Sequence, residues 1–300
     1  MKLCCVTSYC GHTGDFASRL YELAEAGFEY CSWGHQWCTD FLYTKPEITE
    51  IRRVMKDAGI KVLDIHGSKG AEKCWFSPTE YIRLAGVELV RNRIEMLAEL
   101  GGEGGAVVLH GPNTKFSHES VPAEKTERMT RDALIQIDYA FRTLDELMPV
   151  LEKCNVKIAI ENLIWDDWGL VNRYLERYPA ERLGVCFDAG HANLLGNRMN
   201  EMEQRKSRIV ATHLHDNDGE HDLHKPLFTG TMDCEALAKL IATSSYKDRV
   251  PCFELSMKNT PYWDEGFEYP WEQSEENRKA FLKEAYESCA RFGAMIEAAK

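Results

Sequence analysis

Four short stretches each end an apolar, strand-like run with a residue that can bind a metal: Ile158-Ala-Ile-Glu161, Gly184-Val-Cys-Phe-Asp188, Ala211-Thr-His-Leu-His215 and Pro251-Cys-Phe-Glu254. The final residues are separated by 27, 27 and 39 positions (161 to 188, 188 to 215, 215 to 254), about one strand-loop-helix-loop unit each. Carboxylate and imidazole groups at the carboxyl ends of successive parallel strands point into one shared mouth. These residue types suit a divalent cation. The sequence therefore predicts a divalent-metal site at the mouth of a barrel.

The strand-like runs recur along the whole chain and alternate with helical stretches. We expect eight strands within residues 2–7, 28–34, 60–67, 105–111, 156–163, 182–190, 208–216 and 249–256. The 300 residues carry no linker, low-complexity segment or further sequence repeat. This pattern predicts an α/β fold in which residues 1–300 form a single (β/α)8 TIM barrel domain. A doubly wound α/β sheet is the alternative.

Local signals mark several of the helices. Thr44 and Glu47 form a capping-box pattern, and Ser77-Pro78-Thr79-Glu80 repeats it with proline at the first helical position. The last helix, after residue 273, carries one apolar stripe that we expect to be buried: Phe281, Ala285, Cys289, Phe292 and Ile296.

The composition limits the kinds of partner. The net charge of −12 argues against a groove for nucleic acid, because that partner is itself a polyanion. No stretch reaches the roughly 18 apolar residues of a membrane helix, so we expect a soluble protein without a targeting segment or a membrane partner. The 11 cysteines include no Cys-x-x-Cys pair and several lie within apolar runs, which favours the reducing cytoplasm. A homo-oligomer remains open.

All seven tryptophans fall in segments that follow the expected strands. Any one of them has an ordinary explanation, since long loops need aromatic anchors in order to pack. As a set they indicate an aromatic-walled pocket that stacks on the apolar face of a sugar. We take Trp33 and Trp165 as candidate substrate-binding residues.

Each candidate ligand also has an ordinary reading. Glu161 and Glu254 could be solvated carboxylates at strand ends. Asp188 is the expected ligand in Asp188-Ala-Gly-His191, where His191 could instead hydrogen-bond that aspartate. His213 and His215 share one face of a strand, so only depth separates them. We expect His215, nearer the strand end, to be the ligand and His213 to be a buried, hydrogen-bonded neighbour.

Four further residues could line the mouth. Asp222 and His224 are two positions apart in a loop, where they could chelate a metal or simply be solvated. His66 and His110 end the third and fourth expected strands. Each of these two could contact substrate, bind a second metal or satisfy polar groups in the mouth.

At these residues the chain resembles the xylose-isomerase-like superfamily of metal-dependent barrels, and within it the sugar phosphate isomerase/epimerase branch. The resemblance rests on Glu161 in Ile-Glu-Asn, Asp188 and His191 in Asp-Ala-Gly-His-Ala-Asn, His215 in His-Leu-His-Asp-Asn-Asp-Gly, and Glu254 in Phe-Glu-Leu. It implies that one divalent metal is bound by Glu161, Asp188, His215 and Glu254. It further implies that the two glutamates act as catalytic acid and base, and that His191 touches a substrate hydroxyl.

The same superfamily contains endonuclease-IV-like enzymes with three zinc ions. Nine residues resemble that family's ligands in order: His66, His110, Glu161, Asp188, His191, His215, Asp222, His224 and Glu254. The resemblance thus also allows additional zinc at His66/His110 and at His191/Asp222/His224. The acidic charge argues against the nuclease, which needs a basic surface to hold phosphates.

The sequence accordingly predicts a metal-dependent isomerase or epimerase of a small sugar, sugar phosphate or inosose-like ketone. Its cofactor would be Mn2+, Mg2+, Co2+ or Zn2+, and its reaction proton transfer through an enediolate. The substrate-binding candidates are His66, His110, His191, Asp222, His224, Trp33 and Trp165. The alternatives are a multi-zinc phosphodiester hydrolase and a non-catalytic sugar-binding barrel.

Overall fold

Eight parallel strands form a nearly closed barrel. In the computed structural model, the described residues are 1–68, 70–112, 123–164, 168–194, 199–267 and 269–300. The strands are β1 (Cys4–Val6), β2 (Tyr30–Trp33), β3 (Lys61–His66), β4 (Ala106–Leu109), β5 (Lys157–Glu161), β6 (Leu183–Asp188), β7 (Ile209–His213) and β8 (Cys252–Phe253). They pair in the order β7-β6-β5-β4-β3-β2-β1-β8. A parallel bridge between Leu214 and Phe253 brings the two ends of this sheet together.

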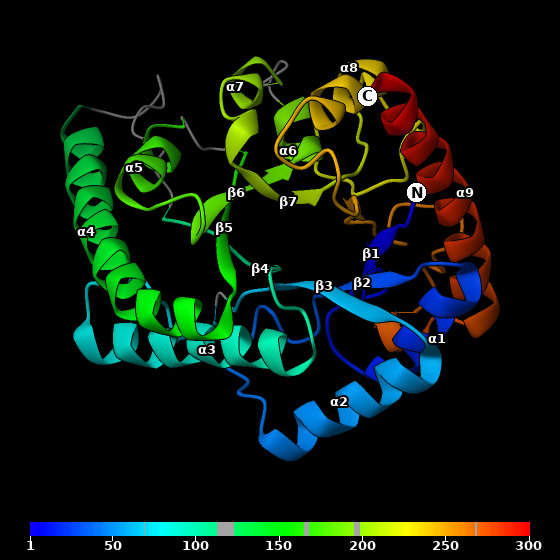
Figure 1. The fold of residues 1–300 in the computed structure, drawn as a ribbon, viewed down its shortest axis with the longest axis horizontal. Coiled ribbons are helices and arrows are strands. Elements are labelled where there is room, and N and C mark those ends of the chain that lie inside the picture. The colour runs from blue at the N-terminus through cyan, green and yellow to red at the C-terminus, as the bar shows by residue number, and fades with distance from the viewer. Residues whose placement is uncertain (69, 113–122, 165–167, 195–198, 268) are drawn as a thin grey trace.

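The helices surround the strands as an outer ring (Figure 1). Within the described residues they are α1 (Phe16–Ala26), α2 (Lys45–Ala58), α3 (Glu80–Glu99), α4 (Ala123–Cys154), α5 (Gly169–Arg177), α6 (Ala189–Asn193), α7 (Met199–Glu203), α8 (Cys234–Ala242) and α9 (Glu275–Ala299), with 3-10 turns η1 (Lys206–Arg208) and η2 (Pro270–Glu272). This confirms the predicted (β/α)8 barrel, and each observed strand lies within the range expected for it. No helix among these residues combines the length and apolar character needed to cross a membrane.

The helix signals are confirmed in two cases out of three. Thr44 and Glu47 form the expected capping box of α2. The stripe on α9 is buried throughout, at Phe281, Ala285, Cys289, Phe292 and Ile296. At α3 the prediction was wrong, since the helix begins at Glu80 with Thr79 as N-cap. The Ser77 hydroxyl accepts from the Thr79 amide at 3.1 Å, and Arg83 takes both carboxylate oxygens of Glu80 at 2.8 and 2.9 Å. The Ser77 hydroxyl and the Glu80 carboxylate, which would form the capping box, therefore make these other hydrogen bonds instead.

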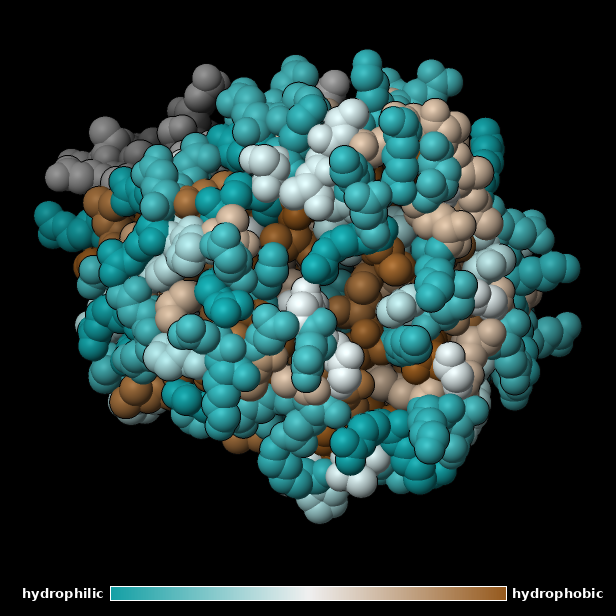
Figure 2. Space-filling model, in the orientation of Figure 1, coloured by the Kyte–Doolittle hydropathy of each residue, from teal (hydrophilic) through white to brown (hydrophobic). Residues whose placement is uncertain are grey.

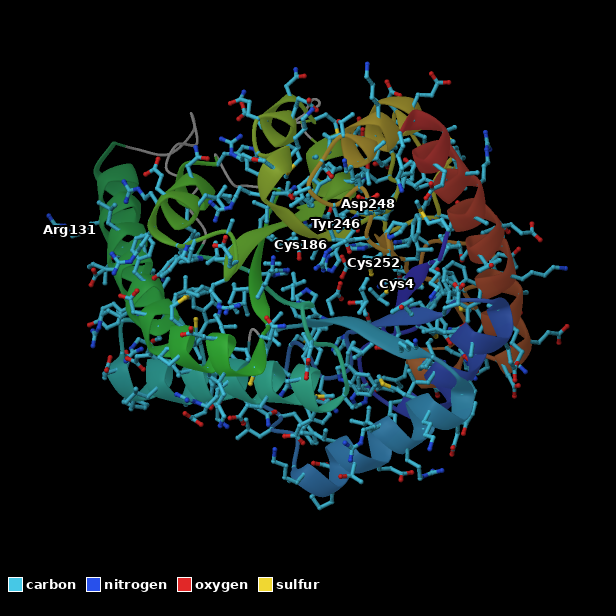
Figure 3. All side chains as sticks on the ribbon, viewed as in Figure 1. Cys4, Arg131, Cys186, Tyr246, Asp248 and Cys252 are labelled. Carbon is cyan, nitrogen blue, oxygen red and sulfur yellow. The ribbon has the colours of Figure 1, made fainter. Side chains whose placement is uncertain are left out.

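Polar residues cover most of the outside of the barrel, and apolar side chains lie inside the ring of helices. Figure 2 shows hydrophilic residues over most of the viewed face, with hydrophobic residues visible near its centre. In Figure 3 the labelled Cys4, Cys186 and Cys252 lie within the ring of helices, while Arg131 projects outward from α4. All three cysteines are fully buried and act as small apolar side chains of the barrel.

A buried ion-pair network joins the first helix to the last. Glu22 on α1 accepts from the Arg278 guanidinium on α9 at 2.7 Å and lies 3.5 Å from Arg19. The Tyr9 hydroxyl, in the loop after β1, also donates to this carboxylate. Glu22 is 4% exposed, so its charge is shielded from water. The network thereby holds α1 against α9, the first and last helices of the outer ring.

We predict that Glu22→Gln lowers the free energy of unfolding by about 3 to 5 kcal/mol, because it leaves buried guanidinium groups without their carboxylate. Urea denaturation measures this. Glu25→Gln is the matched control on the same helix, since Glu25 pairs with Lys279 in an exposed ion pair. That variant should unfold like the parent protein. Equal stability of the two variants would contradict the role assigned to Glu22.

Candidate metal and sugar site

Three of the predicted carboxylates meet at the mouth of the barrel. Glu161 and Asp188 are the last residues of β5 and β6, and Glu254 directly follows β8. Glu161 is 2% exposed and Asp188 is fully buried. The apolar runs before them lie in the barrel core, so each carboxylate is held at the point where its strand leaves that core.

His213 lies between the two glutamates. Its Nδ1 atom is 3.2 Å from Oε2 of Glu161 and 3.1 Å from Oε2 of Glu254. Ligand atoms from Glu161, Asp188, His213 and Glu254 lie within 4.8 Å of one another, a grouping that could hold a metal ion. The sequence reasoning treated His213 only as a neighbour. Its position at the end of β7 gives it direct contact with both glutamates.

His215 contacts the same cluster from another side. Its Nε2 atom is 3.1 Å from Oδ1 of Asp188, and its ring stacks on that of His224 with centroids 4.0 Å apart. His215, His224 and Glu254 form another group of possible ligands. A Cβ on Gly190 would stand 1.8 Å from Cε1 of His215, so only glycine leaves room for this imidazole. His215 remains the predicted ligand, with His213 beside it.

His191, Asp222 and His224 form the third predicted cluster. The Asp222 Oδ2 atom lies 3.3 Å from Nε2 of His191 and 3.2 Å from Nε2 of His224. The Asp188 carboxylate accepts from the His191 amide at 2.6 Å and caps α6. The short helix therefore presents His191 to the mouth, where these three residues could hold a cation.

His66 and His110 come from the ends of β3 and β4. Their Nε2 atoms lie 3.8 and 3.3 Å from Oε2 of Glu161. The two histidines and Glu161 form a further group of possible ligands. The structure thus brings all nine candidate histidines and carboxylates to one mouth, in overlapping groups that are linked through Glu161, Glu254 and His224.

The charges in this mouth are strongly coupled. Burial alone would raise the pKa of Glu161, but the imidazoles of His110 and His213 outweigh it and hold that pKa well below its ordinary value. Burial lowers the pKa of His66 to about 4, and the neighbouring His110 adds to this effect. Without a metal, this cluster is therefore a set of ionised carboxylates facing imidazoles.

The pKa values of His191 and His224 are raised, whereas that of His66 is lowered. Burial opposes protonation of His191, but Asp188 and Asp222 outweigh it and raise its pKa to about 10. For His224 burial is likewise outweighed, chiefly by Asp222, and the pKa rises to about 9. These bound protons neutralise carboxylates, which is the role a divalent cation can take over.

The donor set fits such a cation. Nδ1 of His213 and Oε2 of Glu161 are buried and face each other, yet among the described residues neither has a hydrogen bond of acceptable geometry. The two atoms are close to each other but not oriented for a mutual hydrogen bond, an arrangement expected of ligands that point at a shared cation. Oxygen and imidazole nitrogen together suit Zn2+, Mn2+, Co2+ or Mg2+.

The aromatic residues divide into core and mouth. Trp33 is fully buried and its indole nitrogen donates to the Tyr43 hydroxyl at 3.1 Å. Trp37, in the loop after β2, instead packs against His66, with ring centroids 4.3 Å apart and the ring planes tilted by 37°. The aromatic wall next to the cluster is thus Trp37, which the sequence reasoning grouped with the other tryptophans without singling it out. Trp165 lies outside the described residues.

Asn162 is a site residue that the sequence reasoning missed. Its side chain accepts from the Asp188 amide at 2.8 Å and donates to the Asp188 carbonyl at 2.9 Å. Its own carbonyl lies 2.9 Å from Nδ1 of His191. The signal was present in Glu161-Asn162, since hydrogen-bonding residues around metal ligands commonly orient those ligands.

Comparison with known proteins gives the family. The family described as the xylose isomerase-like TIM barrel matches residues 20–285. The chain belongs to this family, which confirms the resemblance seen at the strand ends. A protein of Sinorhizobium fredii described as uncharacterized is 28% identical over 301 residues, covering 93% of this chain and 88% of its own length.

Solved structures share the fold. A D-tagatose 3-epimerase-like protein superposes with a TM-score of 0.73 at 19% identity, covering 99% of each chain. D-psicose 3-epimerase has a TM-score of 0.69 at 15% identity, again over 99% of each chain. The 3-keto-D-glucoside 4-epimerase of E. coli has a TM-score of 0.65 at 17% identity, covering 95% of this chain and 98% of its own.

The raised histidine pKa values predict a pH dependence. After removal of divalent metal with a chelator, protonated His191 and His224 should stabilise the fold fully below their unfolded pKa of about 6.5. This contribution should disappear as the pH rises through about 9 for His224 and about 10 for His191. Thermal unfolding from pH 6 to 10 measures it. Asp222→Asn should reduce the stability that is lost between pH 6 and 10. If that variant loses as much stability as the parent protein, the two histidines are not the cause.

Proposed function

We propose that this protein is a metal-dependent isomerase or epimerase of a small sugar, sugar phosphate or inosose-like ketone. The observation that carries the proposal is the arrangement of Glu161 and Glu254, each within 3.2 Å of the same nitrogen of His213. Two carboxylates from strands on different sides of the mouth can reach the two faces of one substrate carbon. The likeness to solved sugar epimerases supports the same chemistry.

Glu161 and Glu254 would act as acid and base. One carboxylate removes the proton from the carbon next to the carbonyl and the other returns a proton, either to the opposite face or to the neighbouring carbon. The pKa of both is held low, for Glu254 chiefly because His213 outweighs the effect of burial. A carboxylate of low pKa is a weak base, so the enediolate that forms needs strong stabilisation.

We propose that the cation is held by Glu161, Asp188, His215 and Glu254, of which His215 contacts Asp188. The other candidate for the imidazole position is His213, whose nitrogen is the one that groups with these three carboxylates. When bound, a divalent ion supplies Lewis-acid stabilisation of negative charge on the substrate oxygens. The protein's own part is to orient the glutamates and to keep their charges apart from bulk water.

The remaining polar residues would position the substrate. His66 and His110 lie on one side of Glu161, and His191 with Asp222 and His224 on the other. Such flanking donors and acceptors can bind the hydroxyl groups of a sugar. Trp37, which packs against His66, offers an aromatic ring for the C–H surface of the sugar. Cys4, Cys186 and Cys252 are buried thiols, which fits a reducing, cytoplasmic setting, and we also propose that setting.

A second candidate function rests on the three ligand groups. His66/His110/Glu161, the Glu161-centred group of four and His191/Asp222/His224 would suit several cations and phosphodiester hydrolysis. The net charge of −12 opposes binding of a nucleic-acid strand. A non-catalytic sugar-binding barrel is the third possibility.

Solvent exchange tests the acid and base roles. During turnover of a ketose in D2O, deuterium should appear at the carbon next to the carbonyl. Glu254→Gln should suppress turnover and exchange by a factor of at least about 100, the range for loss of a general acid or base, while the sugar still binds. Asp218→Asn, at an exposed loop carboxylate, is the control and should retain activity. Conversion without exchange in the parent protein would show hydride transfer and overturn these roles.

Metal content separates the two enzyme proposals. The purified protein should carry one tightly bound metal per chain, and Asp222→Ala combined with His224→Ala should keep it, because that pair lies to one side of the main group. The main group is Glu161, Asp188, His213 and Glu254, which contains neither residue of the pair, although His224 also lies beside His215 and Glu254. Elemental analysis measures the metal content of both proteins. Three metals in the parent protein would favour the hydrolase, and loss of all metal from the double variant would show that the ligands are divided differently.

A further inference from the structure

A cavity of about 560 Å3 lies at the end of the barrel opposite the candidate metal site. Tyr30 and Lys61, which line it, are the first residues of β2 and β3, whereas the metal-site residues follow the strands' carboxyl ends. The loop after α3 closes one side with residues 100–105. Its volume is in the range of small-molecule sites.

The cavity has an apolar floor and a cationic rim. Its apolar residues come from α2, β3 and the ends of α2 and α3: Met55, Ile60, Val62, Leu63 and Leu100. Its basic residues come from three separate segments: Arg52 and Lys56 on α2, Lys61 on β3, and Arg249 before β8. Against these four cations stands one lining acid, Glu103.

These cations lack the partners expected in an acidic protein. With a net charge of −12, carboxylates are plentiful. Yet within the described part of the chain none of the four has a carboxylate oxygen within 4.0 Å. On the same helix, Arg53 is paired with both Glu50 and Asp57. Arg52 and Lys56 are four positions apart on α2, where like charges repel and weaken a helix.

Ordinary structural roles account for only part of the cluster. Lys56 lies in the last turn of α2, where a positive charge complements the helix dipole. Arg249 donates to the carbonyl of Gly104 at 3.1 Å. Neither role explains Arg52 or Lys61. The positive region also extends to Lys157, whose pKa is lowered first by burial and second by Arg249.

We propose that this cavity binds a small organic phosphate monoester, with the phosphate among the four cations and an apolar body on the floor. A phosphate dianion supplies the charge that the protein lacks there, and its oxygens can accept from several of the cations at once. The apolar floor favours an organic ester over the inorganic ion. This site is independent of the proposed reaction, because it lies at the other end of the barrel.

Phenyl phosphate is a suitable probe, with inorganic phosphate and phenol as comparisons. We would titrate each into the purified full-length protein with 13C-methyl methionine and follow the NMR signals. Met55 lines the cavity, whereas Met257 lies near the mouth, in the loop after β8. Phenyl phosphate should shift Met55 saturably and bind more tightly than inorganic phosphate, and phenol should have no effect.

Lys56→Gln combined with Lys61→Gln removes two of the cations. This variant should bind phenyl phosphate at least about tenfold more weakly, since one hydrogen bond to a charged group is worth that much. Arg131→Gln combined with Lys283→Gln is the control of equal charge change, at exposed positions on α4 and α9. It should bind within about twofold of the parent. Equal weakening in both variants, a shift of Met257 without Met55, or equal binding of phenol would each overturn the proposal.

Discussion

The structure depends on charge compensation between buried carboxylates and imidazoles at the barrel mouth. Glu161, Asp188 and His213 are each at most 2% exposed, so none can rely on water for its charge. They are tolerable only because they neutralise one another or a shared cation. This requirement fixes where each strand must end, since a shift of one residue would turn a ligand toward the helices. The barrel therefore holds in place a buried polar cluster whose members come from several different strands.

The sequence predicted the fold well because its signals are local and repeated. Strand-like runs alternate with helical stretches along the whole chain, and α2 and α9 carry local signals of their own, so the eight units are visible without any tertiary information. The sequence also identified the carboxylates, because strand ends in a barrel share one edge. Glu161 and Asp188 occupy the last positions of β5 and β6, as expected.

The sequence could not show how deeply each side chain at that edge is buried or which neighbours it packs against. His213 and His215 share a strand face, and only the observed end of β7 at His213 shows that this imidazole contacts both glutamates. Trp33 ends β2 and Trp37 lies in the loop after it, yet the first fills the core and the second packs against His66. Which member of such a pair faces the mouth depends on long-range packing, here on Tyr43 and its hydrogen bond to Trp33.

The two ends of the barrel carry opposite electrostatic problems. At the mouth, buried carboxylates are balanced by imidazoles, which can release their protons to solvent when a metal binds. At the base, Arg52 and Lys61 have no carboxylate within 4.0 Å among the described residues, so their positive charges lack an ion-pair partner there. A metal would resolve the first imbalance, and the proposed anion would resolve the second. Because the strands and their apolar side chains separate the two ends, each site can bind its own ligand without competing for the charges of the other.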